Sequence, residues 1–190
     1  MSGAVTVMET PRLRLRTASA DDGAFFLGLV NEPTWLATIG DRHIHTVDAA
    51  RAALETGPIA QQQELGYSFY IVEHRGDGVA IGMCGLIKRA TMPGPDIGYA
   101  LLPAYCGQGL AWEAASGVLR HARDVLRLPT VYGLVSPQNQ PSINLINKLG
   151  LRFERFSRQP IAGKDINIYR KSFFSSCMLW GTPNIEGIRR

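Results

Sequence analysis

A glycine-rich turn, Cys106-Gly107-Gln108-Gly109-Leu110-Ala111, stands between an apolar segment that ends at Leu102-Pro103 and a long helix-forming segment. Glycines permit unusual backbone angles and let main-chain N–H groups approach a ligand closely. The first turn of a helix has N–H groups without partners inside the helix, and the helix dipole adds partial positive charge there. A strand, a glycine turn and a helix in that order can therefore bind a pyrophosphate.

Other interpretations of this turn are possible in principle. The simplest is a tight turn that only connects a strand to a helix. A dinucleotide-binding fingerprint needs a third Gly or Ala where this chain has Trp112, and an acidic residue about 20 positions later. Because no Asp or Glu occurs between Asp124 and Glu154, the sequence disfavours that fingerprint. A P-loop is excluded because no Gly-Lys-Ser/Thr follows the glycines.

The elements expected around this turn alternate between strands and helices. Apolar runs bounded by turn signals predict strands at residues 13–17, 67–73, 79–87, 96–102, 130–135, 152–156 and 166–173. Helices are expected after the N-cap residues Ser19 and Thr46, the second one closing at Gly57-Pro58, and over residues 113–127 and 142–149. Early hairpins followed by a strand–helix–strand unit indicate an α/β sheet of mixed direction.

Length and composition fit a single folded domain. The chain has 190 residues, of which 45% are hydrophobic and 19% are charged, so a disordered protein is not expected. We expect one domain over residues 10–174 and a C-terminal tail over 175–190, which has no periodicity and for which poor order is expected. No apolar run approaches the roughly 20 residues of a membrane helix, and the N-terminus lacks the pattern of a secretory signal.

Cysteine and histidine usage predicts neither disulfides nor a metal site. The three cysteines lie far apart in the sequence and form no disulfide framework, so a reducing, cytoplasmic location is expected. His43 and His45 are two residues apart without further ligands nearby, which does not predict zinc binding.

The net charge of +4 is mild, and the basic residues are scattered. Arg12, Arg14 and Arg16 alternate with Leu13 and Leu15, which predicts a strand with one solvated face. A nucleic-acid partner is not expected, because nucleic-acid-binding proteins usually cluster their charge. A modest positive field would help to attract an anionic cofactor.

The glycine turn resembles motif A of the GNAT acetyltransferase superfamily, whose pattern is Arg/Gln-x-x-Gly-x-Gly/Ala. Gly109 and Ala111 match its last two fixed positions, whereas Cys106 departs from the Arg or Gln of the first. The other segments resemble the ribosomal-protein (RimJ/RimL-like) branch of that superfamily. They are the opening strand Pro11–Arg16, the strand Asp96-Ile97-Gly98-Tyr99, the helix start Trp112–Ala115, and motif B in Asn139–Ser142 with Lys148–Leu151. Leu151 replaces the usual Phe of motif B, and the similarity covers about residues 10–173.

The resemblance implies the GNAT fold, a mixed, mostly antiparallel sheet with flanking helices that is splayed at two central parallel strands. On this chain those strands are 96–102 and 130–135. The implied cofactor is acetyl-CoA as the acetyl donor, with its pantetheine arm between the two strands. The residues expected to bind it are Leu101, Leu102, Cys106, Gly107, Gln108, Gly109, Leu110, Ala111, Asn139 and Ser142.

The expected site also needs a general base, for which the sequence offers several candidates. An α-amino group, with a pKa of about 7.7–8.0, needs only a modest base, whereas a lysine with a pKa of about 10.4 needs a stronger one. Asp96 opens a strand that flanks the thioester and is the first choice, with a second-sphere carboxylate as the alternative interpretation. Glu73 and His74 are further choices. Many family members have a glutamate where this chain has Leu134.

The acid that protonates the leaving thiolate is similarly open. Many relatives use a tyrosine where this chain has Ile146, so the branch resemblance assigns this role to Ser142. Tyr169 lies in a segment similar to the last strand of the branch and is a third catalytic candidate, with a core aromatic as the alternative. A nucleophilic Cys106 is not expected, because a GNAT-type site transfers acetyl directly.

The acceptor is expected to be a primary amine. The N-terminal amine of a protein or peptide is the leading choice, followed by a small-molecule amine, an amino acid or an aminoglycoside. Trp35 lies between the first two expected helices, a region that lines the acceptor cleft in the family, and is therefore a substrate-binding candidate. A non-catalytic acyl-CoA-binding regulatory module is the alternative outside enzymology. A monomer or homodimer is expected.

Overall fold

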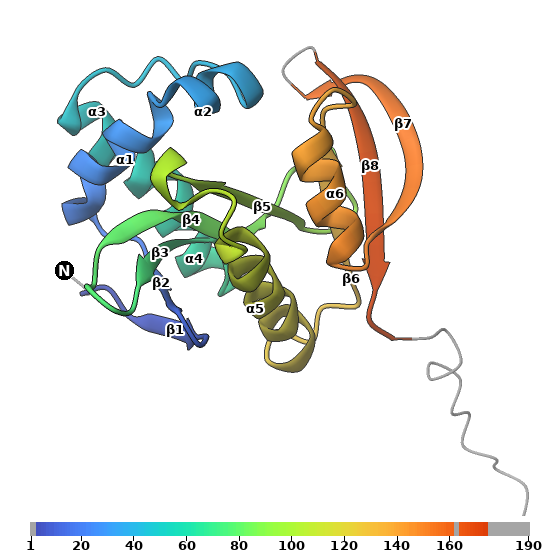
Figure 1. Cartoon of the computed structure of the whole chain (residues 1–190), viewed down its shortest axis with the longest axis horizontal. Helices are drawn as coiled ribbons and strands as arrows, with labels where there is room; N and C mark the ends of the chain where they lie inside the picture. Colours follow the sequence, from blue (N-terminus) through green and yellow to red (C-terminus); the bar gives the residue numbers. More distant parts are fainter. Residues whose placement is uncertain (1–2, 162–163, 175–190) are drawn as a thin grey trace, which may run out of the picture.

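One eight-stranded sheet forms the centre of the protein (Figure 1). The computed structural model describes residues 3–161 and 164–174, and the expected tail over 175–190 lies outside these residues. The strand order is β1-β2-β3-β4-β5-β6-β8-β7. The strands are β1 Thr6–Glu9, β2 Leu13–Thr17, β3 Phe69–His74, β4 Ala80–Ile87, β5 Asp96–Leu101, β6 Thr130–Val135, β7 Arg152–Ile161 and β8 Lys164–Ser172.

The helices cover both faces of this sheet. They are α1 Gly23–Val30, α2 Pro33–Thr38, α3 Val47–Leu54, α4 Ala60–Leu65, α5 Leu110–Asp124 and α6 Gln140–Lys148, with 3-10 turns η1 Ala20–Asp22 and η3 Pro103–Tyr105 and a π turn η2 Glu55–Ile59. The buried residues of α5 and α6 pack with β2–β6 in the larger hydrophobic cluster, and those of α1 and α3 pack with β3 and β4 in a second cluster. In Figure 1, α5 lies beside β4 and β5, and α6 beside β6 and β8.

The two central strands part soon after they pair. β5 and β6 run parallel, and their register joins Asp96 to Tyr132 and Ile97 to Gly133. The other four residues of β5, Gly98–Leu101, have partners on β4 but not on β6 in the described structure. The remaining strand pairs are antiparallel. The expected fold class, a mostly antiparallel sheet splayed at two parallel strands, is therefore confirmed.

The expected start of the second helix was correct, but its expected end was wrong. Thr46 caps α3 by accepting a hydrogen bond from the Ala49 N–H. The helix does not close at Gly57-Pro58, however, because the chain continues through η2 into α4 and stops at Gly66, whose φ is 75°. Pro58 has no N–H to donate, and the wider π turn accommodates that missing bond without ending the helix.

Two short elements were not expected from the sequence. β1 lies before the expected domain start at residue 10 and pairs with β2. α2 begins with Pro33 at its first turn, a position where a missing N–H costs nothing. The helix expected over 113–127 begins three residues earlier, at Leu110. Among the described residues, no helix combines the length and the apolar character needed to cross a membrane.

Candidate functional site

The glycine turn has the backbone geometry that an anion-binding loop requires. Gly107 and Gly109 adopt φ angles of 75° and 76°, a region that favours glycine. Gly109 is the N-cap of α5, so the loop leads directly into the free N–H groups of a 15-residue helix. Residues Cys106–Gly109 are exposed, Leu110 is buried, and a Cβ added at Gly107 would meet nothing within 4 Å.

The end of β5 and the turn after it lie against the loop. Leu102 is held to the sheet by a bond from its N–H to the Ile81 carbonyl, at 2.8 Å. The Cys106 thiol lies 3.7 Å from the carbonyl oxygen of Leu102 and 3.9 Å from that of Leu101. These contacts fold the loop back on the end of β5. They also place Cys106 at the start of the loop with an exposed side chain.

The start of α6 faces β5 across the splay. Asn139 caps this helix, and its side-chain oxygen accepts a hydrogen bond from the Ser142 N–H at 3.1 Å. The Tyr99 hydroxyl donates to the Ser142 carbonyl oxygen at 3.3 Å, which connects β5 to α6. Burial raises the pKa of Tyr99 to about 12, so this hydroxyl stays protonated at neutral pH. Sequence reasoning noted Tyr99 only as part of a motif and missed this contact, for which no sequence signal existed.

Asp96 lies at the closed end of the splay. Its side chain is only 3% exposed and accepts a hydrogen bond from Arg89 Nε at 2.9 Å. Burial raises the pKa of Asp96 to about 6, although the Arg89 charge opposes the shift. Because side chains alternate along a strand, Asp96 and Tyr99 point to opposite faces of the sheet. The structure therefore separates Asp96 from the face that carries Ser142.

Tyr169 lies in the core on the α6 side of the sheet. It is 5% exposed, lies opposite Gly133 of β6, and its ring meets that of Phe153 at 5.7 Å between centroids. It belongs to the same hydrophobic cluster as Ile146, which is almost fully buried. The environment of Tyr169 in the described structure is thus that of a packed aromatic.

The other two base candidates are already paired. Glu73 accepts hydrogen bonds from Arg14 and Arg16, at 2.7 and 2.5 Å. Burial tends to raise the pKa of Glu73, but the two arginines outweigh it and hold the pKa below its ordinary value. His74 contacts Asp77 in the turn that follows its strand, at 3.2 Å.

The alternating arginines of β2 are more than a solvated face. Arg12 pairs with Glu113, Arg14 with Glu73, and Arg16 with both Glu73 and Asp22. The expected strand was correct, but the interpretation of its polar side as merely solvated was incomplete.

Trp35 lies on α2, half-buried against the hydrophobic cluster that includes Phe69 and Leu102. Its indole Nε1 is buried and has no hydrogen-bond partner among the described residues. Core packing therefore accounts for the ring, and Nε1 is a buried donor without a partner in the described structure.

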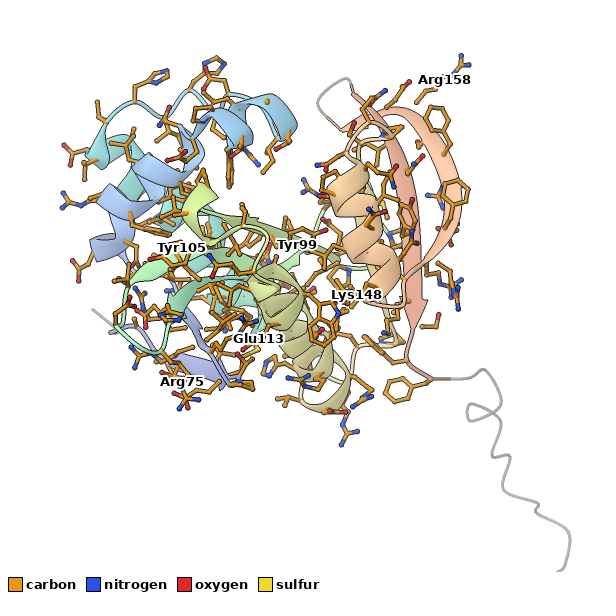
Figure 2. All side chains as sticks on the ribbon, in the orientation of Figure 1. Arg75, Tyr99, Tyr105, Glu113, Lys148 and Arg158 are labelled. Carbon is orange, nitrogen blue, oxygen red and sulfur yellow. The ribbon has the colours of Figure 1, made fainter. Side chains whose placement is uncertain are left out.

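A basic groove runs along α5 from Trp112, in the first turn of that helix, and borders the end of α6. It is lined by Trp112, Ser116, Leu119, Arg120, Arg123, Lys148, Leu149, Lys171 and Phe173. Lys148, labelled in Figure 2 near the end of α6, lies 5.2 Å from the Trp112 ring centroid. Burial and the neighbouring Arg123 lower the pKa of Lys171. Four cations and no acid line this groove, which favours an anion there.

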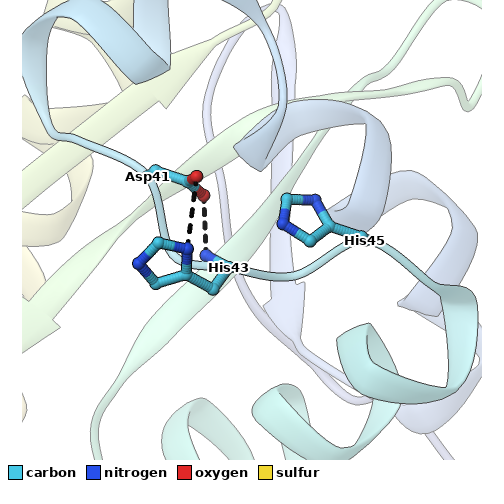
Figure 3. A group of neighbouring side chains, drawn as sticks. All are labelled: Asp41, His43 and His45. Carbon is cyan, nitrogen blue, oxygen red and sulfur yellow. Dashed lines mark hydrogen bonds and ion pairs between the residues drawn. The ribbon is translucent and has the colours of Figure 1, made fainter.

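Asp41 joins His43 and His45 in an exposed cluster that the sequence did not predict (Figure 3). The ligand atoms of the three side chains lie within 4.8 Å of one another. The Asp41 carboxylate already accepts a bond from the His43 N–H at 2.6 Å and lies 3.3 Å from the His43 ring. His43 has a φ of 54°, so these contacts close a tight turn, and we assign the cluster that role.

Known proteins resemble this chain in sequence and in fold. A family model described as an acetyltransferase (GNAT) domain matches residues 12–152. The Bacillus subtilis protein YkkB is 29% identical over 179 residues, which are 90% of this chain and 98% of that protein. A structure of RimL, the ribosomal L7/L12 alpha-N-protein acetyltransferase, in complex with coenzyme A has a TM-score of 0.77 at 18% identity and covers 88% of this chain and 98% of that one. The ribosomal-protein-S5-alanine acetyltransferase of Vibrio fischeri has a TM-score of 0.75 at 17% identity, over 88% of this chain and 96% of that one.

Proposed function

The chain belongs to the GNAT acetyltransferase family, whose acetyl donor is acetyl-CoA, and from this premise we propose that it acetylates the N-terminal amine of a protein or peptide. The observation that carries the proposal is the splay between β5 and β6, together with Gly109 as the N-cap of the helix α5 that follows β5. The β5 residues after Ile97 have no partner on β6, so their backbone groups are available to an extended ligand. The helix N-terminus is available to phosphate.

The residues present fit acetyl-CoA. Positive φ at Gly107 and Gly109 and the open space at Gly107 leave room for phosphates against the main chain. The basic groove next to Trp112 supplies cations for a ligand that carries several phosphates. In this proposal Leu101 and Leu102 bind the pantetheine arm, Cys106–Ala111 bind the pyrophosphate, and Asn139 and Ser142 contact the arm from α6.

Acetyl-CoA supplies a thioester that an amine can attack directly. The chain has to hold the amine in its neutral form, stabilise developing negative charge on oxygen, and provide a proton for the departing thiolate. We assign proton removal to Asp96, whose pKa of about 6 leaves it ionised at neutral pH. Ser142 is the proton donor of this proposal, and Tyr169, on the same face of the sheet, supports it. The indole N–H of Trp35 would donate a hydrogen bond to the substrate that receives the acetyl group.

The acceptor class is supported by likeness in fold. RimL, an alpha-N-protein acetyltransferase, covers nearly the whole described chain with a TM-score of 0.77. An α-amine also needs less help from a base than a lysine does, since its pKa is about 2.5 units lower. This suits a site whose carboxylate candidate is buried and ion-paired.

One observation favours a second function, a non-catalytic acyl-CoA sensor. The two positions where many relatives hold an acid and a tyrosine are occupied here by Leu134 and Ile146, and both are apolar. Ile146 has a hydrocarbon side chain and therefore cannot contribute a proton. It is 1% exposed and packs in the core. A sensor would bind CoA and release no thiol with any amine.

The test combines CoA binding with an acceptor panel. Calorimetry measures CoA affinity, and thiol release with mass spectrometry measures transfer to a lysine-free peptide, an N-terminally blocked lysine peptide, a polyamine and an aminoglycoside. We expect CoA binding and fastest acetylation of the free peptide N-terminus. Fastest acetylation of a small amine would show that the acceptor is not a peptide N-terminus. CoA binding without thiol release with any amine would support the non-catalytic sensor.

Gly109→Glu should weaken CoA binding at least about tenfold, because it puts a carboxylate beside the pyrophosphate at a φ of 76°. Gly66→Glu is the matched control, since Gly66 has a φ of 75°, open surroundings and a position at the end of α4. Both variants carry the same strain and charge. Equal CoA affinity for the two variants would show that the loop does not bind the cofactor.

A further inference from the structure

Arg12, the residue before β2, reaches the glycine loop almost 100 residues away in sequence. Its Nη1 donates to the Gln108 carbonyl oxygen at 3.0 Å, and its Nε donates to Glu113 Oε2 at 2.7 Å. Its Nη2 lies 3.6 Å from the place that a Cβ at Gly109 would occupy. One guanidinium group therefore spans the loop and the first turn of α5.

Glu113, labelled in Figure 2, holds Arg12 in place through hydrogen bonds. Its Oε1 accepts hydrogen bonds from the Thr10 hydroxyl at 2.6 Å and from the Arg12 N–H at 2.8 Å. Thr10 is 5% exposed and is itself held to Leu13. Burial tends to raise the pKa of Glu113, but the bonds from Thr10 and Arg12 outweigh it and lower that pKa. The carboxylate is thus ionised and fully engaged at neutral pH.

The bond to Gln108 fixes the direction of one loop N–H. A trans peptide unit is planar, and its C=O and N–H point to opposite sides. Because the Gln108 carbonyl is turned toward Arg12, the Gly109 N–H of the same peptide unit points away from Arg12. The Gln108 side chain adds a second restraint, since its Nε2 donates to the Ala104 carbonyl at 2.8 Å.

The charge of Arg12 also removes a local conflict. A carboxylate in the first turn of α5 would repel a phosphate bound at that helix end. The guanidinium lies between the carboxylate and the loop, bonded to both, and cancels this repulsion. A pre-oriented donor loses less entropy when the ligand binds, which strengthens binding.

We propose that Arg12 is a positioning residue for the cofactor, and that with Glu113 and Thr10 it holds the glycine loop in the form that binds pyrophosphate. This inference rests on the proposed acetyl-CoA site. It assigns a function to the N-terminal segment, which lies far from the loop in sequence. It also distinguishes Arg12 from Arg14, whose partner Glu73 lies on the neighbouring strand β3.

The test compares Arg12→Met with Arg14→Met. Both variants remove one arginine of similar exposure from the same segment and break one ion pair, so both should lower thermal stability. Only Arg12→Met should raise the Kd for CoA and the KM for acetyl-CoA, by about tenfold, with kcat at saturating donor within about twofold of the parent.

Acetyl-pantetheine, which lacks the pyrophosphate, is the second donor in this experiment. Arg12→Met should leave kcat/KM for acetyl-pantetheine unchanged, because the loop then has no phosphate to bind. Equal CoA affinity in the parent and Arg12→Met, or equal losses with both donors, would overturn the inference while leaving the proposed function standing. A parent that binds no CoA would overturn both.

Discussion

Asp96 is a buried carboxyl group whose ionisation falls close to neutral pH. Burial raises its pKa to about 6, and Arg89 keeps its charged form accessible. A general base needs a pKa a little below the working pH, which Asp96 has. Asp96 lies at the closed end of the splay, on the face of the sheet away from α5 and α6. In the proposed function, the acceptor amine approaches from this face.

The pH dependence of the reaction tests this assignment. A base acts in its deprotonated form, so kcat/KM for the acceptor should rise with pH through about 6, before the further rise caused by amine deprotonation. Asp96→Asn should lower kcat about 100-fold or more and remove the step near pH 6. A rate profile that keeps this step in Asp96→Asn would assign it to another group.

The burial of Asp96 predicts a separate effect on stability, which serves as the control. Since its pKa is raised from 3.8, the native state binds a proton more tightly than the unfolded state does. The stabilisation is complete below about pH 4 and is lost as pH rises through about 6, a change of about 3 kcal/mol in the free energy of unfolding. Asp96→Asn should remove this slope whether or not Asp96 is catalytic.

At the residue scale, sequence patterns predict whether a side chain is buried better than they predict which residues it binds. The alternation of arginine and leucine from Arg12 to Arg16 correctly predicts that Leu13 and Leu15 are buried in the core. The partners could not be predicted, because Glu73 and Glu113 lie 59 and 101 residues away from the arginines they bind. Only the packed sheet brings them together.

At the scale of elements, Gly133 sets how closely α6 approaches β6. A Cβ at this position would lie 2.8 Å from Ile146 Cδ1 and 3.1 Å from Leu151 Cδ2. Both side chains are 1% exposed and belong to the larger hydrophobic cluster, so they would have to repack to admit the methyl group. The start of α6 carries Asn139 and Ser142, so this contact also positions one wall of the proposed site.

Gly133→Ala should therefore push α6 away from the sheet. We expect a loss of about 1–3 kcal/mol in the free energy of unfolding, with a higher KM for acetyl-CoA. Gly28→Ala is the matched control, because Gly28 lies in α1 with nothing within 4 Å of the added Cβ, and alanine there should be neutral or stabilising. Urea unfolding and steady-state kinetics on both variants decide the matter, and equal stability would refute the close packing.

Element types were predictable where periodicity or capping was strong. Apolar residues at helical spacing predicted α5, and Thr46 correctly marked the start of α3. The continuation past Gly57-Pro58 was not predictable, because that pair usually ends a helix and a π turn has no sequence signature. β1 and α2 are only four and six residues long, too short for a periodic pattern to show.

At the scale of the molecule, the segments that resemble the family converge on one region. The N-terminal segment bonds to the glycine loop, β5 bonds to α6 through Tyr99, and both contacts border the splay. This explains why several weak motifs in the right order predicted the fold. The splay itself could be predicted only from the resemblance, since composition and periodicity do not indicate where two strands part.

A network of charges joins the first strands to the first helix. Arg16 bonds to both Asp22 and Glu73, and Arg14 also bonds to Glu73. Both carboxylates are 7% exposed. Burial tends to raise the pKa values of Asp22 and Glu73, but the bonds from arginine outweigh it, so both pKa values are lowered.

This network should make the whole protein sensitive to acid. A lowered native pKa means that the unfolded state takes up protons first, so the stabilisation is complete above about pH 4 and is lost as pH falls through the native pKa values. Asp96 does not add to this loss, because its native form stays protonated in acid and its unfolded form only completes its protonation as pH falls below its ordinary pKa of 3.8. Glu73→Gln should cost about 3 kcal/mol at pH 7, since it leaves Arg14 and Arg16 without their shared partner, and should flatten the loss of stability as pH falls below about 4. Urea unfolding at several pH values measures both effects. If the unfolding free energy of Glu73→Gln falls as steeply with decreasing pH as that of the parent, the acid sensitivity arises from other residues.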